Sequence, residues 1–264
     1  MNFRCLALVA LTVVGGVRGG HANAQTGKQI TTQDQFWVAY INTLKFSERW
    51  SLGTDIQERR SIDPDAQFLF AVRAHVMRTL GRSWDVRAGG SYFLQWSNDP
   101  RSSSDLIVPE WRPHVELNNT TTIGRLRLDH RYRGEARFIP EVTDGQLAGG
   151  HLFTNFRLRY QLGLEFPLVR VKRDEKRIER MYLRIADEVM LNAGSKVVLN
   201  TFDQNRVLIG IGYKPTPALT IILSYLDLVQ QRPTGNFYFH RHNIRLTVVH
   251  KLDLSRKEPV KGAP

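Results

Sequence analysis

The sequence predicts an all-β fold, an antiparallel up-and-down transmembrane β-barrel with a polar and basic interior. Three observations predict it: long segments in which polar and apolar residues alternate, an N-terminal export signal, and no later apolar run long enough for a membrane helix. Alternation with a period of two puts the two kinds of side chain on opposite faces of a strand. In a transmembrane barrel one face meets lipid and the other faces the lumen.

Residues 1–24 have the pattern of a cleaved signal peptide. Arg4 supplies the positive start, Cys5 to Val14 is an apolar run, and Ala22-Asn23-Ala24 is a small-residue cleavage site. Cleavage before Gln25 removes the only cysteine of the chain, so we expect no disulfide or thiol chemistry in the mature protein. Export of a barrel predicts localisation in the bacterial outer membrane.

The most regular alternation lies in the segment from Arg125 to Phe138. Its odd positions are all charged, and they are Arg125, Arg127, Asp129, Arg131, Arg133, Glu135 and Arg137. Its even positions are mostly apolar, and they are Leu126, Leu128, His130, Tyr132, Gly134, Ala136 and Phe138. One face of this strand is therefore a ladder of guanidinium and carboxylate groups, and we expect it to face the lumen.

Ten further segments repeat this design with less charge. In order, they are residues 36–46, 50–60, 67–80, 84–96, 110–119, 151–166, 181–191, 203–214, 219–230 and 237–254. Most have the length of about nine residues or more that a tilted membrane strand needs. Residues 97–108 and 140–150 are predicted to be long loops. Because bacterial single-chain barrels have even strand numbers, we expect about 12 strands, with about 10 as the alternative.

We expect a single domain without an internal linker. The barrel is predicted to span residues 35–254, after a flexible polar segment at 25–34 and before a C-terminal tail at 255–264. One residue opposes the pattern, because Asp187 shares the outward face of its strand, where a carboxylate facing lipid is costly. A bulge or a position near the rim would resolve this conflict.

Two residue types favour a membrane barrel over a soluble β-sandwich. The tryptophans fall near the ends of predicted strands, where the interfacial girdle of a barrel lies, and they are Trp37, Trp50, Trp84, Trp96 and Trp111. Arginine predominates over lysine on the polar face of the central strand. The planar guanidinium group suits packed ion-pair networks, whereas exposed strands commonly carry lysine.

Several stretches, taken in order, resemble domain-of-unknown-function family 2490, a family of bacterial outer-membrane β-barrels. They are Gln35-Phe36-Trp37, Trp50 to Arg60, Glu110-Trp111-Arg112, Leu128 to Phe138, Phe156 to Tyr160, Asp187-Glu188, Asn205-Arg206 and Gly210 to Tyr213. The resemblance covers nearly the whole predicted mature chain. It implies an outer-membrane location, contact with outer-membrane lipid and the barrel-assembly machinery, and no established activity. The chain departs from many barrels, which end in an aromatic residue, because it continues past Leu254.

The arginine-rich face has two interpretations. In the first interpretation, its arginines form an anion-binding or anion-selective lumen, and the candidates are Arg125, Arg127, Arg131, Arg133, Arg137, Arg157 and Arg159. Alternatively they pair with carboxylates and fill the barrel, and the candidate partners are Glu110, Glu116, Asp129, Glu135, Glu165 and Glu188. We favour the filled, largely occluded lumen, because side chains fill barrels of about eight strands and open channels appear at about sixteen. A small anion-permeable channel, or porin, is the alternative.

Other chemistries have weaker support in the sequence. His240 and His242 share one strand face, but a metal site needs three or four converging ligands, so we expect no metal. No cofactor motif stands out, and an envelope lipid-modifying enzyme, the third hypothesis, would need a serine and histidine pair that the strands do not offer, so we expect no enzyme. The basic segment Arg170 to Arg180 is predicted to be a solvated turn, with contact to lipopolysaccharide phosphates as the alternative. The net charge of +12 does not indicate nucleic acid, because the basic residues follow strand faces.

Overall fold

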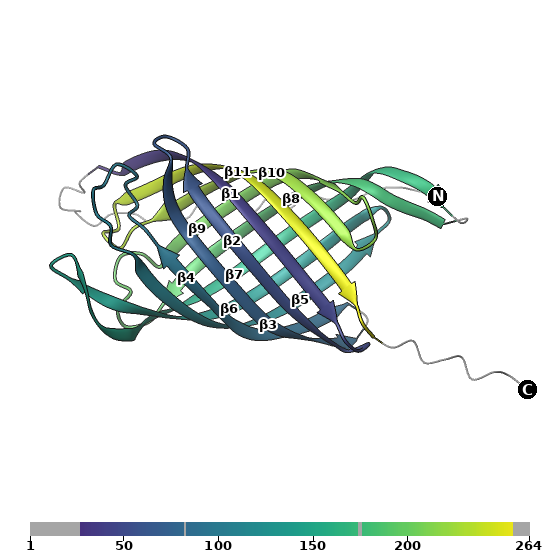
Figure 1. Ribbon diagram of the computed structural model, residues 1–264, viewed down its shortest axis with the longest axis horizontal. Helices are drawn as coiled ribbons and strands as arrows, with labels where there is room; N and C mark the ends of the chain where they lie inside the picture. The colour runs from purple at the N-terminus through teal and green to yellow at the C-terminus, as the bar shows by residue number, and fades with distance from the viewer. Residues whose placement is uncertain (1–26, 82, 174–175, 256–264) are drawn as a thin grey trace, which may run out of the picture.

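The computed structural model describes residues 27–81, 83–173 and 176–255, which form a closed β-barrel (Figure 1). The predicted signal peptide, residues 1–24, and residues 256–264 of the predicted tail lie outside the described residues. No helix that is long and apolar enough to cross a membrane occurs in the part of the chain that the structure describes. The prediction of an all-β fold is therefore confirmed for these residues.

Eleven strands make up the barrel within the described ranges. They are β1 (Gln29–Lys45), β2 (Trp50–Ser61), β3 (Ala66–Gly81), β4 (Trp84–Gln95), β5 (Val108–Ile123), β6 (Leu126–Thr143), β7 (Gln146–Arg173), β8 (Lys176–Ala193), β9 (Phe202–Tyr213), β10 (Leu219–Gln231) and β11 (Phe237–Asp253). Each corresponds to one of the alternating segments of the sequence. β1 starts at Gln29, so most of the segment predicted to be flexible, residues 25–34, belongs to a strand.

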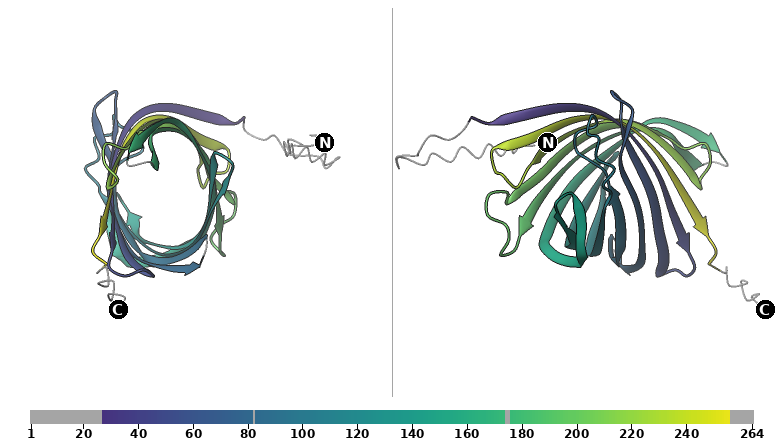
Figure 2. Two further views of the ribbon diagram at one scale, coloured as in Figure 1. Left: turned by 90° about the vertical axis from the view of Figure 1, so that its right-hand side faces the viewer. Right: turned by 60° about the vertical axis from the view of Figure 1, so that its left-hand side comes forward.

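The barrel closes through a parallel pair of strands. Consecutive strands are antiparallel, whereas β1 and β11 run in the same direction, with Gln29 opposite Phe237 and Lys45 opposite Asp253. The view along the axis shows the resulting closed ring (Figure 2, left). The expected 12 or 10 strands are therefore wrong for the described residues: an odd number of alternating strands leaves the first and last parallel, and that pairing closes this barrel.

The two ends of the barrel differ in the length of their connections. At the end that we call the loop end lie the connections 96–107, 194–201 and 232–236, and the start of β1. At the opposite end, the turn end, lie the connections 46–49, 124–125 and 214–218, none of them longer than five residues, and the end of β11. In Figure 1 the loop end is on the left and the turn end is on the right.

Two hairpins extend beyond neighbouring strands, one at each end (Figure 1). Residues 140–150, predicted to be a long loop, instead continue β6 and β7 around a two-residue turn at Asp144 and Gly145. Both turn residues have positive φ, at 51° and 73°, as an Asp-Gly type I′ turn requires. At the turn end, residues 170–173 and 176–180 of the basic segment belong to β7 and β8, and residues 174–175 lie outside the described residues.

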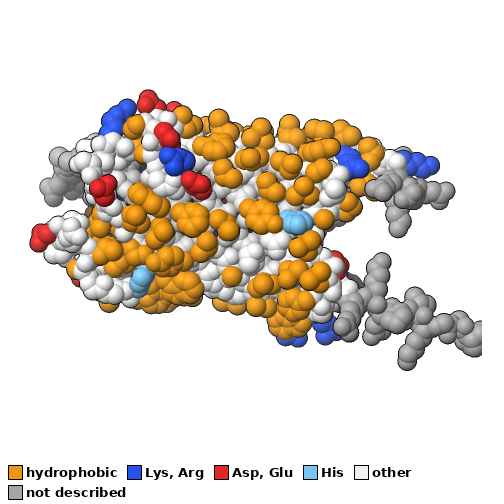
Figure 3. Space-filling model, viewed as in Figure 1, with side chains coloured by type: hydrophobic (Ala, Val, Ile, Leu, Met, Phe, Trp, Pro, Cys, Tyr) orange, Lys and Arg blue, Asp and Glu red, His pale blue; other side chains and the backbone are white. Residues whose placement is uncertain are grey.

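The barrel is apolar outside and polar inside, the reverse of a soluble protein. Hydrophobic side chains cover most of the outer wall, and charged side chains gather toward its ends (Figure 3). At least half of the surface of each of five outer side chains is exposed, and these are Val115, Leu158, Ile209, Leu223 and Ile244. The most deeply buried side chains include charged and amide groups, such as Glu110, Glu116, Arg241 and Asn243.

One tryptophan departs from the predicted girdle. Trp50, Trp84 and Trp111 are exposed on the outer wall, as the pattern indicates. Trp37, however, is only 2% exposed and lies inside the barrel, so its assignment to an interfacial girdle is wrong. It alternates with Phe36 and Val38, which face outward, and strand parity therefore sends its ring into the lumen.

Candidate functional site

Buried carboxylates on β5 to β8 organise the lumen, and most of them are shared by two or more arginines. Glu135 accepts hydrogen bonds from Arg133 and Arg159 at 3.1 and 2.7 Å. Glu188 accepts from Arg131 at 2.6 Å and from Arg159 at 2.7 Å. Because Arg159 bonds both carboxylates, these groups form one connected network and not separate pairs.

The sheet register produces this network directly. Glu116 lies opposite Arg133 on the neighbouring strand, and the two side chains form an ion pair. Glu110 accepts from Arg112 on its own strand and from Arg137 on β6, whose Nε lies 2.5 Å away. Alternation keeps these groups on the inner face, so charged residues two apart on one strand meet partners from the next strand.

Most of the candidate residues lie in the lumen network. Glu165 pairs with Arg127 at 3.4 Å and with Arg184, which sequence analysis did not single out. Arg157 pairs with Asp203 at 2.9 Å, and that carboxylate was also not predicted. The missed partners come from β8 and β9, whose register cannot be read from the sequence.

Two candidates lie away from the centre of this network. Asp129 accepts from Thr120 at 2.7 Å and from Arg127 at 3.1 Å near the turn end. Arg125 precedes β6 and is exposed, and its guanidinium group lies 5.5 Å from the ring centre of Phe166 on the outer wall. The expectation that Arg125 faces the lumen is therefore wrong, because it belongs to the turn and not to the alternating strand.

A second group of arginines surrounds Trp37. The guanidinium carbons of Arg59, Arg245 and Arg206 lie 3.5, 4.2 and 5.6 Å from the centre of its ring. Arg206 reaches Glu188 at 3.5 Å, but no described carboxylate lies within 4.0 Å of the charged nitrogens of Arg59 or Arg245. The face of an aromatic ring attracts cations, so Trp37 partly compensates these charges.

Arg241 is a third kind of lumen arginine. It is 2% exposed and donates to three neutral amide oxygens, on Gln33 at 2.7 Å, Gln230 at 2.6 Å and Asn98 at 3.0 Å. Its guanidinium group also lies 4.2 Å from the ring centre of Phe239. The amide dipoles and the Phe239 ring thus stabilise its positive charge, and no described carboxylate pairs with it.

Among the described residues, lumen side chains line two large cavities. The turn-end cavity has a volume of about 320 Å³, and its lining includes Trp37, Arg245 and Lys251. The loop-end cavity has a volume of about 390 Å³, and its lining includes Asn98, Arg232 and Arg241. Cationic side chains outnumber carboxylates in both linings.

Four side chains line both cavities, and we call them the central layer: Arg59, Phe93, Arg112 and Arg206. Arg112 lies over the ring of Phe93 at 3.9 Å and is anchored by Glu110. The central layer therefore borders both cavities.

Two histidines and two glycines lie next to one another across strands β2 to β5 of the barrel wall. Gly53, His75, Gly89 and His114 are neighbours in one row across these strands. The rings of His75 and His114 meet edge to face, with centres 6.0 Å apart. An added Cβ at Gly53 would lie 2.2 Å from the His75 ring, so glycine makes room for the imidazole.

His240 and His242 lie on the outer wall near the loop end, together with Asp227. Sequence analysis missed this grouping, because Asp227 is on β10 and only the register of β10 with β11 brings it beside His242. Asp187, also on the outer wall, accepts a hydrogen bond from the Asn205 amide at 2.6 Å. The only irregularity between β8 and β9 lies at Met190 and Leu191, so a bulge at Asp187 is absent from that pairing.

Comparisons with known proteins give one family and two solved structures. The sequence model of the family described as "Protein of unknown function (DUF2490)" matches residues 34–239. The chain is similar to the NanC porin, with 14% identity and a TM-score of 0.43 over 75% of this chain and 84% of that one. It is similar to LpxR from Salmonella typhimurium, with 12% identity and a TM-score of 0.43 over 76% and 83% of the two chains. No curated protein matches.

Proposed function

We propose that this chain, which belongs to the DUF2490 family of proteins of unknown function, is an outer-membrane β-barrel that binds anions in its lumen and is closed at mid-height. The role is one of binding and not of catalysis. Its partners are the lipid that covers the outer wall and the barrel-assembly machinery that inserts such proteins.

The outer wall supports the membrane location. On β11 the residues from Ile244 to Leu252 cover about 20–25 Å along the barrel axis, at about 3.3 Å per residue and a tilt of about 40°. This height matches the apolar band of outer-membrane barrels, which is about 25 Å tall. The exposed Trp50 and Trp84 at the turn end fit an interfacial girdle.

The observation that carries anion binding is the group of lumen arginines that lack a described carboxylate: Arg59, Arg245 and Arg241. Burying an uncompensated charge is costly, so such groups favour a mobile counterion. Arg59 and Arg245 both line the turn-end cavity, where an anion has room to approach them. A phosphate or carboxylate group suits them because guanidinium groups bind such oxygens in pairs.

The central layer supports closure. Arg59, Phe93, Arg112 and Arg206 are the side chains common to both cavities. We therefore expect their removal to join the cavities into one path. This same observation favours a second function, a small anion channel, because a single layer of side chains stands between the two cavities. A movement of Phe93 and Arg59 would then open the lumen.

A planar bilayer distinguishes the two functions. We expect protein refolded in detergent, and shown to be heat-modifiable on a gel, to give no steady current under a KCl gradient. The double variant Phe93→Ala, Arg59→Ala should conduct, with a reversal potential that favours chloride, because the remaining lining is cationic. The variant Phe68→Ala is the control, because Phe68 lines the loop-end cavity and is not one of the four side chains of the central layer.

Each other outcome contradicts part of the proposal. Steady anion-selective current through the unmodified protein would support the channel. Cation selectivity in the double variant would argue against an anion-binding lumen. Folding in water but not in detergent would overturn the membrane location.

Anion binding has its own measurement. Inorganic phosphate should raise the midpoint of thermal unfolding in detergent, because a ligand that binds only the folded state stabilises it. Arg59→Ala with Arg245→Ala should abolish the increase. An equal increase in the double variant would place the phosphate elsewhere.

A further inference from the structure

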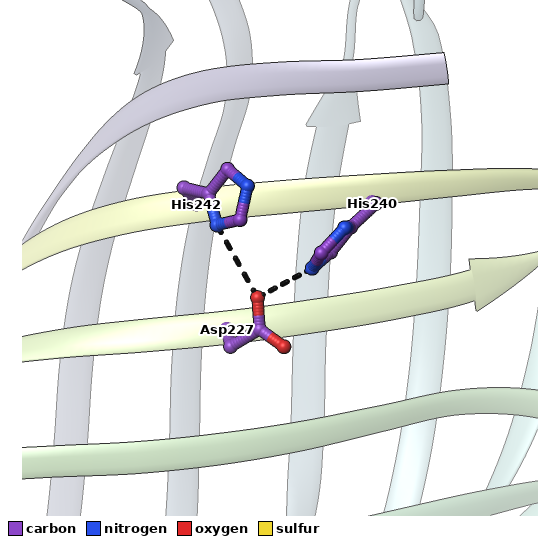
Figure 4. A group of neighbouring side chains, drawn as sticks. All are labelled: Asp227, His240 and His242. Atoms are coloured by element: carbon purple, nitrogen blue, oxygen red, sulfur yellow. Dashed lines mark hydrogen bonds and ion pairs between the residues drawn. The ribbon is translucent and has the colours of Figure 1, made fainter. Parts of the chain in front are cut away.

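We propose that Asp227, His240 and His242 form a binding site for a divalent transition-metal ion, of the class of Zn²⁺, on the outer wall of the barrel (Figure 4). The site lies on the opposite side of the wall from the lumen, so it is independent of the proposed anion binding. We call these three residues the outer cluster.

The geometry of the outer cluster suits a metal. Nε2 of His240 lies 2.6 Å from Oδ1 of Asp227, and Nδ1 of His242 lies 3.3 Å from the same oxygen. The ligand atoms of all three residues lie within 4.8 Å of one another. Ligands about 2.05 Å from a tetrahedral Zn²⁺ are about 3.3 Å apart, so small rotations of the side chains reach coordination distance.

Strand structure pre-orients the three ligands. His240 and His242 are two apart on β11, so both project outward, and their ring centres are 4.4 Å apart. Asp227 lies opposite His242 on β10. The outer cluster therefore sits on two hydrogen-bonded strands, which hold ligands more firmly than a loop does.

The surrounding charge favours a cation. Asp34 on β1 is the register partner of His242, on the side away from Asp227. Asp187 stands further along the same row, beyond Val207 of β9. Three carboxylates thus lie along one outward-facing row of the barrel wall. No Lys or Arg forms an ion pair with Asp34, Asp187 or Asp227 among the described residues.

The donor set selects the class of ion. Two imidazole nitrogens and one carboxylate oxygen suit Zn²⁺ and its neighbours, whereas Mg²⁺ and Ca²⁺ prefer oxygen ligands. Three protein ligands leave a fourth position for water or an external oxygen. The side chains are about one-third exposed, at 35% for His240 and 33% for His242, so this position is reachable from outside.

Two hydrogen bonds must be exchanged when the metal binds. His240 gives up its contact with Asp227, and His242 gives up the Tyr225 hydroxyl, which lies 2.6 Å from its Nδ1. A nitrogen that carries a proton must lose it before it binds a metal.

Calorimetry with ZnCl₂ tests the outer cluster. Untagged full-length protein, refolded in detergent and stripped with EDTA, should bind zinc saturably with one ion per chain. His240→Ala, His242→Ala and Asp227→Asn should each weaken binding by at least about tenfold. Because the three side chains lie on the outer face, these variants should still refold and stay heat-modifiable.

His250 supplies a matched control. It lies on β11 and, like His242, bonds a tyrosine hydroxyl, that of Tyr40 at 3.0 Å, but it belongs to no group of metal-binding side chains in the described residues. His250→Ala should leave zinc affinity unchanged. Binding that is absent, or that His250→Ala weakens as much as His242→Ala, would overturn the proposal.

A measurement on the unmodified protein does not depend on the variants. Bound Co²⁺ should give visible absorption bands typical of nitrogen and oxygen coordination, and one equivalent of Zn²⁺ should remove them. Failure to observe these bands at saturating Co²⁺ would also contradict the outer cluster as a metal site.

Discussion

At the scale of single residues, Glu135 illustrates how the lumen is held together. It is 3% exposed, bonds Arg133 and Arg159, and lies 3.9 Å from a guanidinium nitrogen of Arg112. Buried ion pairs add little net stability compared with apolar packing, but removal of one partner leaves uncompensated buried charge. The carboxylate therefore matters more as a condition for burying its arginines than as a source of stability.

Glu135→Gln should destabilise the folded barrel by about 3 kcal/mol or more, because three arginines lose a shared negative charge. Urea unfolding of protein refolded in detergent measures the change. Glu58→Gln is the control. Glu58 is 46% exposed and among the described residues forms a single ion pair, with Arg60 at 3.7 Å, so its loss should change the free energy of unfolding by less than about 1 kcal/mol. Equal effects of the two changes would contradict a packed ionic lumen.

At the scale of strands, glycine allows β3 and β4 to lie close together in the barrel wall. An added Cβ at Gly89 would lie 2.1 Å from the carbonyl oxygen of Ala74 and 2.5 Å from the His75 Cα. Backbone atoms cannot move aside as a flexible side chain can. In contrast, Gly134 on β6 has no atom within 4 Å of an added Cβ.

Gly89→Ala should therefore destabilise the barrel by about 1–3 kcal/mol, the usual cost of overpacking. Gly134→Ala should stay within about 0.5 kcal/mol of the unmodified protein. Both values come from the same urea unfolding experiment. A tolerated Gly89→Ala would mean that β3 and β4 are further apart than the structure indicates.

The strands were predictable because alternation is a local signal, whereas their contacts were not. Alternation in the sequence predicts whether residues such as Arg133 and Val115 lie on the inner or the outer face. All eleven alternating segments form strands. Trp37 was wrongly assigned to the interfacial girdle because that assignment followed its position near a strand end. Its spacing of two residues from buried Gln35 places it on the inner face instead. Arg157 with Asp203 was missed because register between strands depends on long-range pairing.

At the scale of the whole molecule, the odd number of strands decides how the barrel closes. The rule of even strand numbers led to the wrong expectation, although the segments counted in the sequence gave the observed number. The parallel pair of β1 and β11 places Val38 opposite Leu246. In the same row, Leu223 on β10 lies beyond Leu246.

Cysteines introduced at Val38 and Leu246 should form a disulfide under mild oxidation, in a chain without Cys5, because neighbouring strands are about 4.8 Å apart. A faster-moving band on a non-reducing gel measures it. Cysteines at Val38 and Leu223 should not react, because β11 lies between them. Absence of the first disulfide would imply another strand between β1 and β11.

The surplus of arginine in the cavities has a consequence even if nothing crosses the barrel. A chamber with fixed positive charge behaves as a small ion exchanger, which enriches multivalent anions over chloride and excludes mobile cations. Such a Donnan effect is strong at low ionic strength and fades once the Debye length, about 8 Å at physiological salt, falls below the width of the chamber. The salinity of the surroundings would then set which anions occupy the lumen.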